Sequence, residues 1–188
     1  MKSGENEMKK MNHIKILFCI LLMILLGTVA GCKKNNPVAD DLVQYVETDL
    51  KAILPKEQEA ISNYNMVCEQ TNKLSSKEVI QKFETSILPD YKEFLENLKN
   101  LQPQTQEVRE LKDIYVEGAT LQYEAMNMIV EALKQQDSNK MKEADELIVK
   151  AKSKLQTYEV KLTRLAKDNE IGVANTNSQV STSQESKE

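Results

Sequence analysis

The stretch 141–165, MKEADELIVKAKSKLQTYEVKLTRL, decides the fold class of this chain of 188 residues. Its apolar and small side chains recur at alternating intervals of three and four residues, the spacing that places side chains on one face of an α-helix. They are Met141, Ala144, Ile148, Ala151, Leu155, Tyr158, Leu162 and Leu165. We therefore predict a long amphipathic helix that ends near Asp168 or Asn169.

The segment before it predicts a second helix with a broader apolar face. Two neighbouring rows of apolar and small side chains run along it: Leu111, Ile114, Gly118, Leu121, Ala125, Met128 and Ala132, and beside them Val108, Tyr115, Ala119, Met126, Ile129 and Leu133. A face this broad indicates contact with more than one helix. Thr105 is expected to cap the N-terminus. Gly118 costs about 1 kcal/mol relative to alanine in a helix, so we expect a packing reason for it.

Two more helices are predicted upstream, and each contains a proline. Ser75 and Glu78 form a capping-box pattern, and one continuous face follows: Ile80, Phe83, Ile87, Tyr91, Phe94, Leu98 and Leu101. Because this face continues past Pro89, we predict one kinked helix there. The first helix begins near residue 37 or 38, and Pro55 predicts a kink or a restart within it. Its apolar stripe is Leu42, Val46, Leu50, Ile53, Ile61, Tyr64 and Cys68.

The four predicted helices, of about 25–33 residues each, are joined by short connections. Such a pattern is typical of an all-α, antiparallel up-down four-helix bundle. We predict this bundle, with long and proline-kinked helices, for residues 38–171. Residues 172–188 contain few apolar side chains and are expected to form a disordered polar tail.

The first 32 residues carry a different signal. Lys9, Lys10 and Lys15 precede an apolar run of residues 16–26, which is shorter than the ~20 residues needed to span a bilayer. Small residues follow the run, and this order is typical of a secretory signal peptide. An uncleaved membrane helix is the weaker alternative, because Lys33 and Lys34 end the apolar run early. Met8 is expected to be the true start, since it is followed directly by the basic residues.

The residues Val29-Ala30-Gly31-Cys32 resemble the lipobox of bacterial lipoproteins. The resemblance implies that the Cys32 thiol receives a diacylglycerol and that a peptidase cuts between Gly31 and Cys32. Residues 1–31 would then be the signal peptide, and residues 32–37 the lipidated cysteine and its tether. Because two acyl chains suffice for stable anchoring, we expect a protein held on the extracytoplasmic face of the cell membrane without spanning it.

Composition excludes several classes of function for the mature chain. Residues 1–32 contain four of the 25 basic and two of the 29 acidic residues, which leaves 21 basic and 27 acidic residues and a net charge of −6. This charge disfavours nucleic-acid binding, which uses basic patches. His13, the only histidine, lies in the signal peptide. Histidine-dependent catalysis and the usual zinc sites are therefore excluded, and we expect no cofactor.

The remaining reactive side chains favour structural interpretations. Cys68 lies on an apolar stripe, so burial is favoured over reactive-thiol chemistry. Met126 and Met128 are assigned to core packing rather than to a copper(I) site. The pairs Glu57/Glu59 and Asp40/Asp41 and the cluster Glu143/Asp145/Glu146 lack the spacing of a calcium loop and are predicted to be a solvated face. Tyr45 and Tyr123 fall off the main stripes and could line a groove.

The segments 87–94, ILPDYKEF, and 113–119, DIYVEGA, make the mature part similar to small helical lipoproteins of Gram-positive, spore-forming bacteria. That resemblance implies no activity. We therefore expect a non-catalytic helical module that binds an envelope protein partner or acts as its accessory. A structural envelope spacer is the alternative, and an enzyme built on carboxylates or a small-ligand binder ranks below it.

Overall fold

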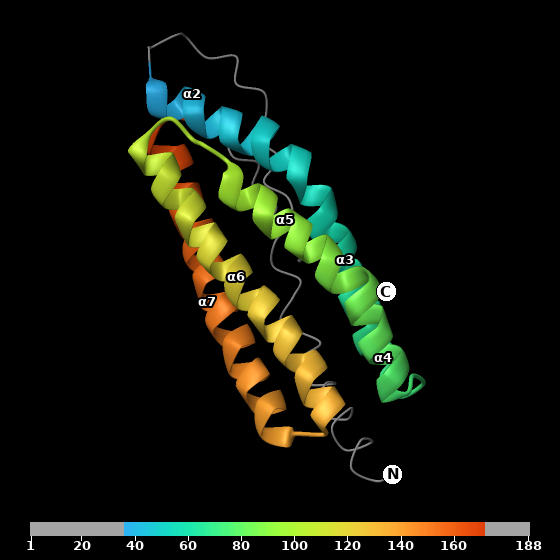
Figure 1. The fold of residues 1–188 in the computed structure, drawn as a ribbon. Coiled ribbons are helices and arrows are strands. Elements are labelled where there is room, and N and C mark those ends of the chain that lie inside the picture. The colour runs from blue at the N-terminus through green and yellow to red at the C-terminus, as the bar shows by residue number, and fades with distance from the viewer. Residues whose placement is uncertain (1–35, 172–188) are drawn as a thin grey trace, which may run out of the picture.

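The computed structural model describes residues 36–171, and this part of the chain is helical, without β-strands. Four helical stretches follow one another (Figure 1). The first consists of α2 (Pro37–Gln44), the π-helical segment η2 (Tyr45–Leu50) and α3 (Lys51–Glu69); the second of α4 (Ser76–Lys82), the π-helical segment η3 (Phe83–Ile87) and α5 (Leu88–Asn100). The third is α6 (Gln106–Gln135) and the fourth is α7 (Ser138–Asp168). The predicted signal peptide, the lipidation site and the polar tail lie outside the described residues.

Short polar side chains start the helices. The capping box predicted at Ser75 is confirmed: its Oγ accepts the backbone N–H of Glu78 at 3.3 Å, and its own N–H donates to Glu78 Oε2 at 2.7 Å. Asp137 caps α7 by accepting the N–H of Asn139 at 2.9 Å. These side chains satisfy amide groups that the first turn of a helix leaves without carbonyl partners.

Pro55 lies inside α3, and the helix continues through it, so the predicted restart at this residue is wrong. In both proline-containing stretches a π-helical segment lies on the N-terminal side of the proline. Such a turn takes up an extra residue and commonly accompanies a bend. The first stretch changes direction between α2 and α3 (Figure 1). The extra residue in η2 also shifts the helical face: the buried Tyr45 and Leu50 are five residues apart, and Val46 between them is only partly covered.

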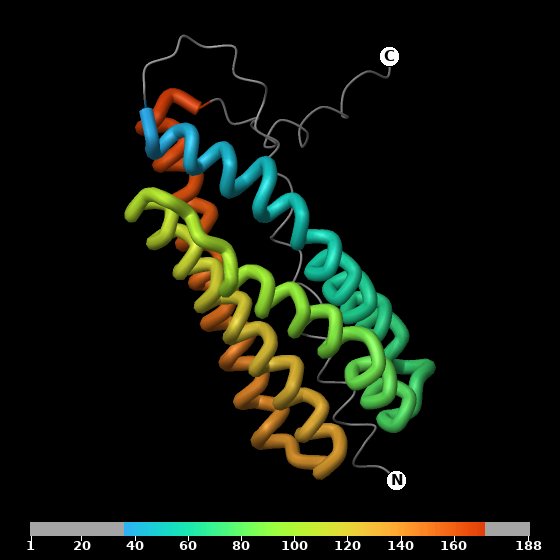
Figure 2. Tube along the Cα trace, turned by 45° about the horizontal axis from the view of Figure 1, so that its top comes forward, coloured from blue at the N-terminus to red at the C-terminus, as the bar shows by residue number. Residues whose placement is uncertain are grey.

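By their contacts the helical stretches group in two pairs, α3 with α5 and α6 with α7. For reference, we name residues 37–100, which contain α2 to α5, the first hairpin, and residues 106–168, which contain α6 and α7, the second hairpin. α6 and α7 lie side by side along their length (Figure 2), and Gly118 of α6 lies against Leu155 of α7. Both helices bury small residues: Gly118, Ala119, Ala125, Ala144 and Ala151. α3 lies beside α5, and α5 lies beside α6. An amide hydrogen bond of 3.0 Å from Asn36 to Asn169 joins the start of the first stretch to the end of the last.

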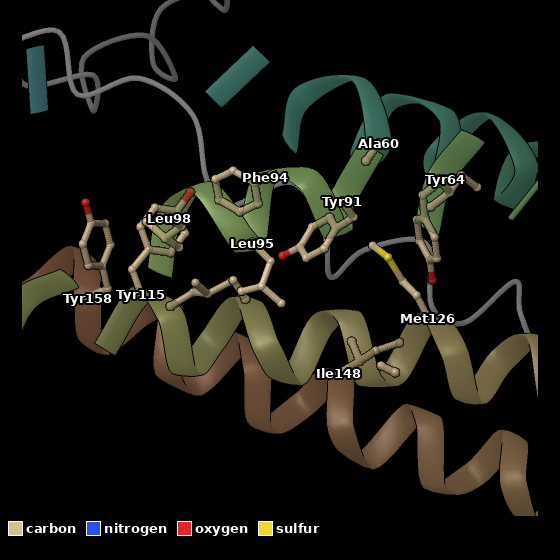
Figure 3. Close-up of a cluster of buried hydrophobic side chains, with 14 of the residues drawn as sticks. Ala60, Tyr64, Tyr91, Phe94, Leu95, Leu98, Tyr115, Met126, Ile148 and Tyr158 are labelled. Carbon is tan, nitrogen blue, oxygen red and sulfur yellow. The ribbon is translucent and has the colours of Figure 1, made fainter. Parts of the chain in front are cut away.

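Buried aromatic side chains fill the space between the two hairpins (Figure 3). The ring of Phe94 lies edge-on to that of Tyr91 at a centroid distance of 5.6 Å and is tilted against Tyr115 at 5.8 Å. Tyr115 in turn packs against Tyr158 of α7 at 4.7 Å. The rings of Phe94, Tyr115 and Tyr158 thus form a continuous aromatic layer from α5 through α6 to α7.

Gly118 has the packing role that the sequence predicts. A Cβ atom at this position would lie 2.7 Å from Leu155 Cδ2 and 2.9 Å from Leu155 Cγ, across the contact between α6 and α7. Gly118→Ala should therefore lower the free energy of unfolding by about 1 kcal/mol, because overpacking of 1–3 kcal/mol exceeds the gain of about 1 kcal/mol in helix propensity. Urea unfolding followed by circular dichroism measures this change.

Leu155→Ala provides the control for Gly118→Ala. In a double-mutant cycle, Leu155→Ala should cost less in the Gly118→Ala background than in the wild type, because the new methyl group then occupies part of the vacated space. Additive effects of the two substitutions would show that the contact between these residues is not the cause.

Candidate functional site

Glu57 of α3 is a carboxyl group inside the core, with 3% of its surface exposed. Tyr115 of α6 donates a hydrogen bond of 2.8 Å from its phenol to Glu57 Oε2. Burial raises the pKa of Glu57 to about 8, although the hydrogen bond from Tyr115 acts to lower it. The side chain is therefore mostly neutral at pH 7, and it joins the two hairpins as a carboxylic acid.

Tyrosines from three helical stretches, Tyr91, Tyr115 and Tyr158, lie near this carboxyl group. With two further residues that contact them they form the carboxyl–tyrosine cluster: Glu57, Tyr45, Tyr91, Tyr115, Tyr158 and Gln122. Tyr91 of α5 donates a hydrogen bond to Gln122 Oε1 of α6. The phenols of Tyr45 and Tyr158 lie close enough that each affects the pKa of the other. Burial raises the pKa of each of the four phenols, so they stay protonated at neutral pH.

The titration of Glu57 links stability to pH. Its pKa is about 8 in the folded chain, against 4.5 for an ordinary glutamate. A carboxyl group with a raised pKa contributes its full share of stability below pH 4.5, where both states are protonated, and loses that share as the pH rises through 8. The contribution of Glu57 to stability is therefore largest under acidic conditions, falls as the pH rises from 4.5 to about 8, and is constant above that.

The cluster has little of what an active site needs. A carboxylate-based enzyme uses paired carboxyl groups that reach a substrate, whereas Glu57 is buried and accepts its hydrogen bond from the phenol of Tyr115. Within residues 36–171 no group of three or more His, Cys, Asp or Glu side chains is arranged to hold a metal ion. The arrangement is suited to holding or releasing one proton at Glu57.

A second buried carboxylate, Asp41, lies at the end of the molecule where α6 begins. Its Oδ1 accepts the N–H of Gln104 at 3.0 Å, and its Oδ2 accepts the N–H and the hydroxyl of Thr105 at 2.7 and 2.6 Å. Burial acts to raise the pKa of Asp41, but the hydrogen bonds from Thr105 and Gln104 outweigh it and hold this pKa below its ordinary value. Asp41 thus carries a charge that binds α2 to the start of α6.

The prediction for Thr105 is wrong in part. This residue holds the N-cap position of α6, but its side chain makes no capping hydrogen bond. Its hydroxyl donates to Asp41 instead. The amide groups that precede α6 are therefore satisfied by a carboxylate from another helix, which no local sequence pattern indicates.

The prediction of a solvated carboxylate face is also wrong for two residues. Asp41 and Glu57 are buried and Asp145 is partly buried, whereas Asp40, Glu59, Glu143 and Glu146 are exposed as predicted. A signal for Glu57 was present in its spacing: it precedes Ala60 by three residues and Tyr64 by seven, so it lies on the same helical face as both. Gln122 was missed as well, because it lies between the two apolar rows of α6.

The other singled-out side chains belong to the core. The predicted burial of Cys68 is confirmed, as is the core position of Met126, while Met128 is partly covered. Tyr45 is fully buried, so it lines no surface groove. Tyr123 is partly buried, and its ring stacks on that of Tyr91 at 6.3 Å.

The surface of the described residues is mostly polar. Its exposed large apolar side chains are Met66 on α3 and Val149 and Val160 on α7. No helix among residues 36–171 is long and apolar enough to cross a membrane. Ion pairs link neighbouring helices at the surface, as between Lys154 and Glu117 at 2.8 Å, and such exposed pairs contribute about 0–1 kcal/mol each.

Comparison with known proteins assigns no family to this arrangement. No protein-family model matches the chain, and no curated protein or solved structure is significantly similar to it. Its function must therefore be inferred from its own residues.

Proposed function

We propose that this protein is a lipid-anchored, extracytoplasmic helical module without catalytic activity, which binds or assists another protein of the cell envelope. The observation that carries the proposal is the lipobox-like sequence Val29-Ala30-Gly31-Cys32. It supports a diacylglycerol on Cys32, cleavage between Gly31 and Cys32, and attachment to the cell membrane through the lipid.

The position of the first helix supports a domain held close to the lipid. α2 begins at Pro37, so only four residues, 33–36, separate it from the proposed lipidation site at Cys32. Four extended residues span at most about 14 Å. The end of the molecule that contains Asn36, Asn169 and the loop before α6 would therefore face the membrane, and the turns at residues 70–75 and 136–137 would face away from it.

We further propose that the four helical stretches form an antiparallel up-down bundle, with a long axis set by α6 and α7. The short turn between these helices and the hydrogen bond between Asn36 and Asn169 support this topology. An acidic rod of this kind can present a polar helix face to a partner at a fixed distance from the membrane.

An envelope spacer is the second candidate, and one observation favours it. The exposed large apolar side chains of the described residues are few, and they are far apart in sequence. A binding module that uses an apolar groove would expose a larger contiguous patch. Partner recognition, if it occurs, would have to use the charged surface, where acidic groups such as Glu107 and Glu124 are exposed.

Cys32→Ala should move most of the protein from the membrane fraction to the soluble fraction or the medium. The thiol is the group that takes the lipid, and the loss of both acyl chains removes the anchoring energy of about 0.8 kcal/mol per buried CH₂ group. Fractionation of cells followed by immunoblotting measures the distribution, and labelling with a radioactive or alkyne fatty acid shows the lipid directly.

Cys68→Ala is the matched control, because this cysteine is buried in the helical domain. It should leave both the labelling and the membrane fraction unchanged. Fatty-acid labelling that persists in Cys32→Ala would contradict the proposed anchor.

In-cell crosslinking followed by mass spectrometry separates the binding module from the spacer. One dominant partner that is lost in Cys32→Ala would support the accessory role. The spacer instead predicts no enriched protein, together with tolerance of added helical turns in α6 and α7.

A further inference from the structure

The two hairpins differ in the regularity of their helices. The first hairpin contains both internal prolines, Pro55 and Pro89, and both π-helical segments, η2 and η3. The second consists of two uninterrupted helices that pack closely through small residues such as Gly118. A movement within the fold would therefore take place in the first hairpin, against the second as a fixed support.

Two buried polar contacts join the hairpins near the middle of their interface: Tyr115 to Glu57, and Tyr91 to Gln122. Glu57 is the member of these contacts that can gain or lose a proton near neutral pH, and it lies two residues after Pro55 in α3. We propose that Glu57 is a pH-sensitive latch, which holds the first hairpin against the second while its carboxyl group is neutral and releases it when the carboxyl group ionises.

The groups that face Glu57 carry no positive charge that would balance an ionised carboxylate. They are phenols: Tyr91 from α5, Tyr115 from α6 and Tyr158 from α7. Burial raises the pKa of all three, so each remains neutral at pH 9. On its own helix the neighbouring Lys56 is directed to the surface, where it pairs with Asp90 at 3.0 Å and Glu93 at 3.3 Å.

An ionised Glu57 would therefore be held only by the hydrogen bond from Tyr115, in surroundings of packed rings. A buried anion with so little compensation is strongly unfavourable. The chain can relieve this cost by exposing the carboxylate to water, and the irregular first hairpin is the part that can move. The latch does not depend on the lipid anchor, so each of the two proposals can fail alone.

The test compares the full-length protein with the full-length Glu57→Gln variant by urea unfolding at pH 5.5 and pH 9. With a pKa of about 8 in the folded state and 4.5 in the unfolded state, the unfolding equilibrium constant of the wild type should rise on the order of 100-fold between these pH values. The amide of glutamine still accepts a hydrogen bond from Tyr115 but does not ionise, so the variant should lose most of this rise. Glu59→Gln, at an exposed position on the same helix, should keep it.

Hydrogen exchange locates the opening. At pH 9, after correction for intrinsic exchange rates, amides of α3 and α5 in the wild type should lose protection before those of the middle of α6 and α7. If amide protection is lost equally in all helices, ionisation of Glu57 lowers only the overall stability of the fold, and the latch is overturned.

A direct titration covers the case in which Glu57→Gln fails to fold. The ¹³C carboxyl signals of labelled glutamate in the wild type should include one that titrates near pH 8, and Tyr115→Phe should move that midpoint upward. If every glutamate titrates in the ordinary range near pH 4.5, or if wild-type protection is the same at pH 6 and pH 9, the latch is excluded.

Discussion

Phe94→Ala should lower the free energy of unfolding by about 3–5 kcal/mol, the range observed when a buried aromatic ring is replaced by alanine. Phe94 is fully buried in α5, where its ring contacts Tyr91 and Tyr115 between the two hairpins. The substitution removes these ring contacts and leaves a cavity that large neighbouring rings fill only in part. Since domains are typically stable by 5–15 kcal/mol, the loss would be a large share of the total.

Urea unfolding monitored by circular dichroism at 222 nm measures this effect. Val160→Ala is the control, because Val160 is 70% exposed on α7 and its truncation should change stability by less than about 0.5 kcal/mol. Similar losses for the two variants would contradict the assignment of Phe94 to the contact between the hairpins.

The same variant also tests the link between the aromatic layer and Glu57. Phe94 packs directly on Tyr115, whose phenol donates to Glu57. A cavity at Phe94 would let water approach the carboxyl group, which lowers the cost of its charged form. The fall in the free energy of unfolding between pH 4.5 and pH 8 should accordingly be smaller in Phe94→Ala than in the wild type.

In the second hairpin, the extents of α6 and α7 and the buried face of α7 could be predicted from the sequence. Seven of the eight side chains assigned to the stripe of α7 are buried, and only Leu165 is partly exposed. The prediction for α7 succeeds because α6 and α7 are regular helices. Each residue turns by the same angle, so one spacing identifies the buried face along the whole helix. Gly118 was expected to have a packing role for the same reason.

The first hairpin could be predicted only in part, because its helices change their period. The π-helical turn η2 rotates the buried face between Tyr45 and Leu50, and the predicted Val46 and Ile53 are only partly buried. Apart from the nearby proline, no pattern in the sequence indicates a π-helical turn. The existence and extent of the helix were predictable, but its buried face was not.

The candidate site was missed for a different reason. Sequence reasoning treats helical carboxylates as solvated, and this holds for Asp40 and Glu59. Glu57 and Asp41 depart from it because groups distant in sequence compensate them: a phenol 58 residues away for Glu57 and the backbone around Thr105, 64 residues away, for Asp41. Such compensation depends on tertiary structure, and no local spacing reveals it.

Asp41→Ala should lower the free energy of unfolding by about 2–4 kcal/mol at pH 7. Hydrogen bonds to a charged group contribute about 1.5–3 kcal/mol each and are not additive. The substitution removes three of them and leaves the N–H groups of Gln104 and Thr105 without their acceptor at the start of α6, where the helix dipole favours a negative charge. Asp40→Ala, at the exposed neighbouring position, should cost less than about 0.5 kcal/mol.

The pH dependence distinguishes the charge of Asp41 from its shape. Because the hydrogen bonds from Thr105 and Gln104 hold its pKa below the ordinary 3.8, the stability that it contributes is present above pH 3.8 and is lost as the pH falls through the lower value of the folded state. Asp41→Asn keeps an acceptor of the same size but cannot ionise, so its stability should fall less steeply between pH 5 and pH 2.5 than that of the wild type. Acid unfolding curves of the two proteins measure this difference. If the stability of both falls equally with pH, Asp41 joins α2 to α6 as a hydrogen-bond acceptor of the right size, and its charge contributes nothing.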